Sequence, residues 1–157
     1  MEERYLFKAK RIDNEEWVIG NLITNASFRL GQSIPYILCP DKAKYDCFEN
    51  FTVFEVQPDT ICQCTGLRDR NGNLIWENDI IHKPFYTDYD AYANSEAYTG
   101  RIQYEDGGWS IEIIKPDGNV CVSSIIDMIA YSKDIEHFEV IGNIFDNPKL
   151  LESERIR

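Results

Sequence analysis

The sequence lacks long hydrophobic runs and the apolar core of an export signal. Among its 157 residues the apolar runs are only a few residues long, whereas a helix needs about 20 such residues to cross a bilayer. The chain starts with the acidic segment Met1-Glu2-Glu3-Arg4, which has no signal-peptide pattern. We therefore expect a cytoplasmic protein that does not bind membranes.

Positive charge is also scarce. The chain has 16 lysines and arginines against 27 aspartates and glutamates, for a formal net charge of −11 at pH 7. Binding to a phosphate backbone needs a basic surface, so this balance disfavours direct contact with nucleic acid. The charge suits solubility, a basic partner protein, or an acidic decoy that occupies a host nucleic-acid-binding protein.

Motifs for metal binding and catalysis are missing as well. The five cysteines form no CxxC pair, and the only histidines are His82 and His137. Cys62 and Cys64 would share one face of a strand, but two further ligands at zinc spacing do not accompany them. No serine elbow, HExxH pair, P-loop or dinucleotide fingerprint is present. The sequence predicts free thiols, no metal, no cofactor and no catalytic residues.

Apolar residues make up 43% of the chain and aromatic residues 13%, which indicates a folded core. Alternating apolar and β-branched residues between turn signals predict short strands. These strands span residues 7–11, 17–23, 34–39, 51–56, 65–69, 73–76, 80–81, 100–106, 109–115, 119–123 and 138–144. Asn147-Pro148 predicts a terminal helical turn, and residues 124–132 fit either a short helix or a twisted strand. The fold class predicted is all-β, or mainly β.

The strands group into two small β modules that meet near residue 60. Residues 1–60 form an N-terminal module of a hairpin and further strands. Residues 61–151 suggest an SH3-like or partly open β-barrel with a tyrosine-rich insertion at residues 84–98, because short strands alternate with glycine-containing turns. Residues 152–157 form a tail.

The clearest local signal is Asn71-Gly72, which predicts a hairpin with a type I′ turn and a positive φ at Gly72. Around it lie Asp69, Glu77 and Asp79, and His82 follows. Clustered carboxylates could serve acid–base chemistry in a hydrolase or nucleotide-processing enzyme. Aspartates beside turns also accept hydrogen bonds from backbone N–H groups, and we favour that structural interpretation. The two differ in whether the side chains converge in one pocket.

The segment from Pro84 to Tyr98 is rich in tyrosine and acidic residues and poor in aliphatic ones. Its composition is typical of adaptable recognition loops, in which tyrosine provides contact area at low entropic cost. A solvated loop without a binding role has the same composition. We expect an appendage to the β scaffold, whose candidate binding residues are Tyr86, Tyr89, Tyr92 and Tyr98.

Three separated segments carry a family resemblance. Residues 7–20 read FKAKRIDNEEWVIG, residues 63–81 read QCTGLRDRNGNLIWENDII, and residues 138–151 read FEVIGNIFDNPKLL. In this order they resemble the YopX family of phage and prophage proteins. The resemblance implies a β-rich accessory protein of unsettled biochemical role. The family pattern has Glu-Gly-Asp where this chain has Glu77-Asn78-Asp79, and asparagine is the non-glycine residue that best tolerates the left-handed conformation.

Together, these features predict a phage or prophage accessory protein in the host cytoplasm that acts by protein binding or self-association rather than catalysis. The acidic decoy and the hydrolase remain the alternatives.

Overall fold

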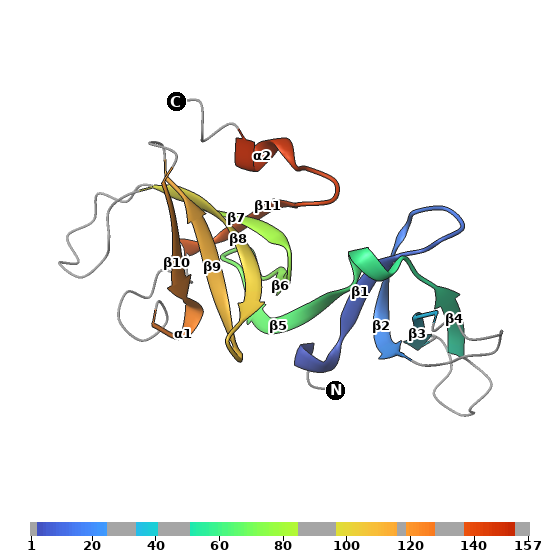
Figure 1. Cartoon of the computed structure of the whole chain (residues 1–157). Coiled ribbons are helices and arrows are strands. Elements are labelled where there is room, and N and C mark those ends of the chain that lie inside the picture. The colour runs from blue at the N-terminus through green and yellow to red at the C-terminus, as the bar shows by residue number, and fades with distance from the viewer. Residues whose placement is uncertain are drawn as a thin grey trace. The chain divides into compact units, whose positions relative to one another are not determined.

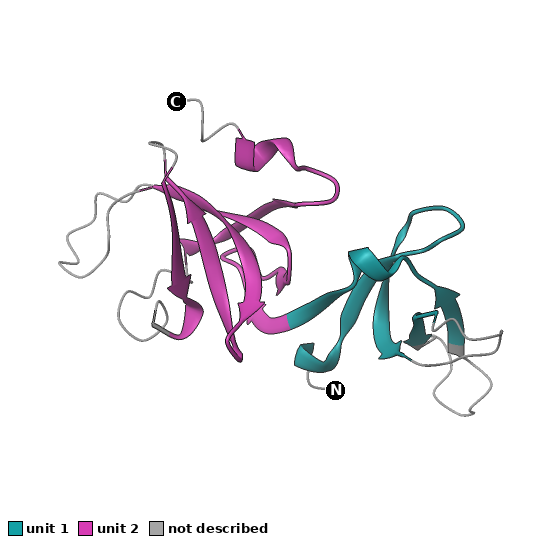
Figure 2. Ribbon diagram, in the orientation of Figure 1, with its two compact units in different colours: residues 1–64 teal, residues 65–157 magenta. Residues whose placement is uncertain are grey.

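The computed structural model describes residues 3–24, 34–40, 51–84, 97–115, 119–127 and 137–152. Most of the tyrosine-rich segment at residues 84–98 lies outside this part of the chain. The chain is mainly β and divides into two compact units, Met1–Cys64 and Thr65–Arg157 (Figure 2). The division falls within a strand, slightly later than the boundary at residues 60/61 that the sequence suggested.

The described residues of the first unit form four antiparallel strands and the start of a fifth. In chain order they are β1 (Phe7–Lys10), β2 (Trp17–Ile23), β3 (Tyr36–Pro40), β4 (Phe51–Glu55) and β5 (Cys62–Arg68), with short 3₁₀ helices at η1 (Glu3–Tyr5) and η2 (Pro58–Thr60) (Figure 1). Neighbouring strands follow the order β4-β3-β2-β1, and the start of β5 pairs with the other edge of β1.

In the first unit, the residues that follow β4 pair with the residues at the end of β1. After β4, Val56 forms an isolated bridge with Arg11, and the Gln57 N–H donates to the Lys10 carbonyl at 2.8 Å. This closure encloses a core of Ala9, Ile37 and Val56, each 0% exposed. The end of β4 is thereby held against the turn that follows β1.

The second unit contains the rest of β5 and a five-stranded antiparallel sheet. Its elements are β6 (Leu74–Trp76), β7 (Asp79–Lys83), β8 (Tyr98–Glu105), β9 (Gly108–Ile114), β10 (Val120–Ser124), α1 (Ile125–Asp127), β11 (Glu139–Asn143) and α2 (Lys149–Glu152) (Figure 1). The sheet order is β10-β9-β8-β7-β11, and no pairing between β10 and β11 occurs among the described residues. The sheet is open rather than a closed barrel, and the SH3-like assignment stays a prediction.

Packed side chains from several strands fill one face of this sheet. The core residues are Ile75, Ile81, Tyr98, Ile102, Ile111, Ile113, Ile125 and Phe138. Those on β8 and β9 lie an even number of positions apart, as the period of two requires, and β7 contributes Ile81. The mainly-β class and the terminal helical turn are confirmed. The ambiguous stretch at residues 124–132 starts with Ser124, the last residue of β10, and continues as the helical turn α1, after which it lies outside the described residues.

The hairpin at Asn71-Gly72 is present, but its turn type differs from the prediction. Gly72 has the expected φ of 83°, whereas Asn71 does not enter the left-handed region. The Gly72 N–H donates to the Asp69 carbonyl, and the Asp69 N–H donates to the Asn73 carbonyl, each at 2.9 Å. This pattern fits a type I turn followed by a left-handed glycine, which adds one residue to the loop.

Candidate functional site

Asp69, a residue considered for catalysis, organises the hairpin that follows it. Asp69 is 6% exposed, and its carboxylate accepts hydrogen bonds from the N–H groups of Asn71 at 2.9 Å, Asn73 at 2.8 Å and Val140 at 3.2 Å. The Asn73 side-chain amide adds a fourth at 3.2 Å. Burial acts to raise the pKa of Asp69, but these donors outweigh it and the pKa is lowered. The carboxylate is thus held ionised as a structural acceptor that links the hairpin to β11.

The next turn, at Glu77-Asn78, uses Asp79 in a similar way. Asp79 is 2% exposed and accepts a hydrogen bond from the Trp76 N–H at 2.8 Å. Asn78 has a φ of 66°, as its place in the family pattern implied. Its side-chain oxygen accepts two hydrogen bonds from Arg101, at 3.1 and 2.7 Å. Both side chains therefore stabilise the turn between β6 and β7.

The side chains considered for catalysis do not all lie on the same side of β7. Asp79 and His82 are separated by three positions on β7 and so lie on opposite faces of it. The His82 imidazole instead contacts the Thr99 hydroxyl on β8 at 3.2 Å. Within the described ranges, no three His, Cys, Asp or Glu side chains are grouped to hold a metal. The contacts of Asp69, Asp79 and His82 therefore support the structural interpretation.

The cysteines follow the expectation of free thiols wherever they are described. Cys62 and Cys64 are both 0% exposed on β5, while Cys39 and Cys121 are partly buried, and none of these four forms a disulfide. The Cys62 thiol donates to the Thr60 carbonyl at 3.4 Å. Burial raises the pKa of the Cys39 thiol. These side chains are packing residues of the strands.

Tyr98 is the one candidate binding residue that the structure describes, and it lies in the core. It begins β8, is 9% exposed, and packs edge to face on Phe138 with ring centroids 6.3 Å apart. The Lys83 ammonium lies 5.4 Å from the centre of its ring. Tyr98 therefore offers no exposed contact surface, contrary to its grouping with the loop tyrosines. Tyr86, Tyr89 and Tyr92 lie outside the described residues and keep their status as predictions.

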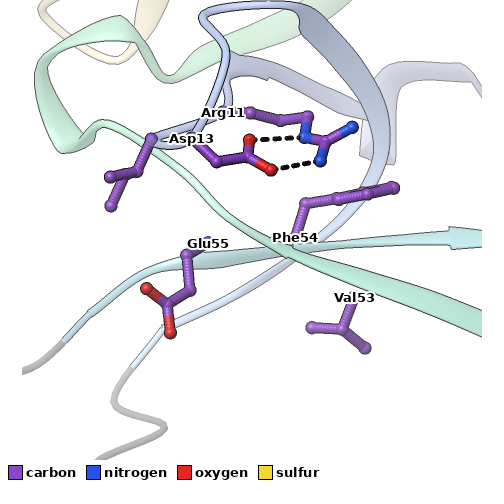
Figure 3. A pocket seen from close by; sticks show the side chains of 6 residues that line it. Arg11, Asp13, Val53, Phe54 and Glu55 are labelled. Carbon is purple, nitrogen blue, oxygen red and sulfur yellow. Dashed lines mark hydrogen bonds and ion pairs between the residues drawn. The ribbon is translucent and has the colours of Figure 1, made fainter.

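A hollow of about 340 Å³ opens in the first unit, where β4 meets the turn after β1. It is lined by Arg11, Ile12, Asp13, Val53, Phe54 and Glu55. Figure 3 shows the Arg11 guanidinium side by side with the Asp13 carboxylate and near the Phe54 ring. The ring centre is 4.2 Å from the guanidinium carbon, which is a cation–π distance.

Acidic side chains compensate the charge of Arg11. The Asp13 carboxylate accepts from Nε at 2.8 Å and also accepts from Nη2, and a Glu16 oxygen lies 3.8 Å from Nη1. The hydrogen bond with Asp13 raises the pKa of Arg11, and the same contact lowers the pKa of Asp13. Glu55 adds a further exposed carboxylate to the lining. Among the described residues that line this hollow, carboxylates therefore outnumber cations.

The edge of β4 that faces away from β3 borders the hollow. The Val56 N–H donates to the Pro35 carbonyl at 3.2 Å, and Ile37 pairs with Phe54 in the same register. Because antiparallel strands bond at alternate residues, the Val53 and Glu55 backbone groups point away from β3. The Glu55 carbonyl accepts from the Ile12 N–H at 3.1 Å. No other described strand pairs with this edge of β4, and Val53 is 49% exposed there.

Sequence reasoning missed this hollow. The strands predicted at residues 7–11 and 17–23 implied a turn between them, and residues 51–56 indicated a strand, but nothing local joined the turn to that strand. The junction depends on the bridge between Arg11 and Val56, residues far apart in the sequence. An unusual signal was nevertheless available, since an arginine two residues before an aspartate can bind it across a turn.

Comparisons with known proteins cover nearly the whole chain. No helix in the described part is long and apolar enough to span a membrane. The sequence has no significant match among curated proteins. Protein EF1440 from Enterococcus faecalis, known from a crystal structure, is 23% identical, with 92% of this chain and 96% of that chain covered and a TM-score of 0.47. The pattern of the YopX protein family matches residues 6–152. The chain therefore belongs to the YopX family.

Proposed function

We propose that this YopX-family protein is a phage or prophage accessory protein that acts in the host cytoplasm by binding another protein. The observation that carries the proposal is the hollow beside the open edge of β4. It combines exposed backbone groups with apolar surface, since Ile12 is 51% and Val53 49% exposed. Exposed strand edges are a common means of protein recognition.

The arrangement of the polar residues favours binding over hydrolysis. Asp69 and Asp79 are engaged by backbone N–H groups, and His82 faces the other side of β7 from Asp79. The acidic decoy is a special case of the binding role, in which the partner is a host nucleic-acid-binding protein. The net charge of −11 supports a basic partner in either case.

Site-specific photocrosslinking tests this proposal. A photoreactive phenylalanine analogue at position 12, expressed in host cells, should form a discrete protein adduct because this side chain borders the hollow. The same analogue at position 105, the exposed last residue of β8, is the matched control. Adducts at position 105 alone, or at neither position, would contradict binding through the first unit.

A second candidate function is self-association through β10. This strand ends its sheet, and Val120 and Val122 on it are 47% and 55% exposed. Apolar edge strands tend to pair with a copy of themselves unless a charge interrupts them. Sedimentation velocity should then show a dimer that Val122→Lys converts to a monomer, and a monomeric wild-type protein would exclude this function.

A further inference from the structure

We propose that the outer edge of β4 binds an extended, positively charged segment of a partner protein, which adds to the sheet as a further strand. This inference rests on the proposed binding function and adds the conformation and the charge of the partner. Three properties of the described residues support it: the direction of the backbone groups, the charge around them, and the apolar side chains between them.

The backbone supplies the first argument. Val53 N–H, Val53 C=O and Glu55 N–H point toward the open side of β4, because Phe54 is the residue that bonds to Ile37. The Ile12 N–H already occupies the Glu55 carbonyl, so an added strand would start beside Val53 and run away from the turn. An extended segment satisfies these groups, whereas a helix has no free donors and acceptors along its side.

The charge supplies the second argument. The side chains of Asp13 and Glu16 are 63% and 72% exposed, and Glu55 is exposed at the end of β4. Arg11 is 22% exposed and its charge is compensated by Asp13 and Glu16. A strand that binds beside β4 therefore meets carboxylates near Glu55, where Ile12 already bonds to the edge of β4. These carboxylates favour lysine or arginine in the partner.

Apolar side chains supply the third argument. Ile12 and Val53 flank the hollow and are about half exposed. Successive side chains of an added strand alternate between the two faces of the sheet. Val53 and Glu55 are two residues apart on β4 and therefore share one face of the strand. A segment that alternates basic and β-branched residues can set its cations on that face, where their aliphatic stems lie over Val53 and their charged ends reach Glu55. Its β-branched side chains then lie on the opposite face, beside Phe54.

The test is a titration of the full chain, labelled with ¹⁵N, with an octapeptide of alternating lysine and valine. We expect the amide resonances of Val53 and Glu55 to shift, and an octapeptide of alternating glutamate and valine to leave them in place. Val53→Pro removes the outward N–H without removing a bond to β3, since proline is tolerated at such edge positions. It should weaken binding about tenfold, whereas Val53→Thr, which keeps the N–H, should not.

Two further controls separate strand addition from charge attraction. Glu55→Gln should weaken binding about threefold, while Glu105→Gln, which removes a carboxylate from the other unit, should have no effect. If Val53→Pro unfolds the protein, a lysine–valine peptide methylated on alternate backbone nitrogens takes its place and should fail to bind the wild type. The inference is overturned if the peptide does not bind, or if it binds equally after these changes. Adducts at position 12 would still support the proposed function in that event.

Discussion

At the scale of single residues, two side chains considered for catalysis, Asp69 and Asp79, accept hydrogen bonds from backbone N–H groups. Asp69 accepts four hydrogen bonds while only 6% exposed, so it fixes the positions of the hairpin and β11 together. Asn78 does the same for the following turn through Arg101. Sequence reasoning could identify the role of Asp69 because turn chemistry is local, whereas the contact between Asn78 and Arg101 joins distant residues and was not predicted.

The effect of replacing Asp69 on the stability of the protein should depend on pH. Asp69→Asn should destabilise the protein by about 2 kcal/mol at neutral pH, because the amide cannot serve four donors as a charged carboxylate does. The folded-state pKa of Asp69 lies below its ordinary value, so the unfolded chain binds the proton more readily. The stabilisation is therefore complete above the ordinary carboxyl pKa of about 4 and is lost as pH falls through the folded-state value.

Urea unfolding of the wild type and of Asp69→Asn, at several pH values from neutral to acidic, measures the free energy of unfolding of each. The difference in the free energy of unfolding between the wild type and Asp69→Asn should become smaller as the pH falls. A difference that stays constant across this range would show that the ionised carboxylate is not what stabilises the hairpin.

Asn78→Gly sets two effects against each other. Glycine relieves the strain of a φ of 66°, worth up to about 1 kcal/mol. It also removes both hydrogen bonds from Arg101, and bonds to charged groups contribute about 1.5–3 kcal/mol. We expect a net loss of about 1 kcal/mol in the free energy of unfolding. In an Arg101→Gln background the glycine should no longer destabilise, and a stabilising effect in the wild-type background would contradict the account.

Tyr98 shows where prediction at this scale fails. Its sequence neighbours suggested an exposed loop, but its environment is set by Phe138, Lys83 and the register of β7 with β8. No local pattern contains that information.

At the scale of elements, alternation and turn residues predicted nearly every strand of the described chain. The turn type predicted at Asn71-Gly72 was wrong, since of these two residues only Gly72 has a positive φ. The Asp69 carboxylate holds the loop in this conformation through the N–H groups of Asn71 and Asn73. The closure of the first unit was also missed, since the bridge from Arg11 to Val56 joins distant segments. Long-range pairing depends on the packed core and leaves little trace in short windows of sequence.

Gly72→Val tests the hairpin directly. A Cβ at this position would meet no atom within 4 Å, so the cost comes from the φ of 83° alone. A β-branched residue in that conformation should lower the free energy of unfolding by about 1 kcal/mol or more. Gly72→Asn, which tolerates positive φ, should cost clearly less, and a valine variant that melts at the wild-type temperature would exclude the assigned turn.

At the scale of the whole molecule, the tyrosine-rich segment is predicted to be dispensable for folding. Its flanking strands end at paired residues, because Lys83 lies opposite Tyr98 in the register of β7 and β8. A short Gly/Ser linker in place of residues 85–97 can therefore join them, and loop-closure entropy changes only weakly with length. The circular dichroism spectrum and melting temperature should stay nearly unchanged.

Tyr98→Ala is the contrasting variant, since it removes a buried aromatic ring and should cost about 3 kcal/mol. Unfolding of the linker variant would mean that the segment, with Tyr86, Tyr89 and Tyr92, contributes to the core. Stable folding would leave those three tyrosines as candidates for a contact surface.

The central claim is that β4 presents an unpaired edge to a partner, and amide hydrogen exchange of the free protein tests it most directly. The Phe54 N–H should exchange slowly because it bonds to β3, whereas the neighbouring Val53 N–H should exchange close to the rate of an unprotected amide. Equal, strong protection of Val53 and Phe54 would show that the edge is already covered and would contradict the account.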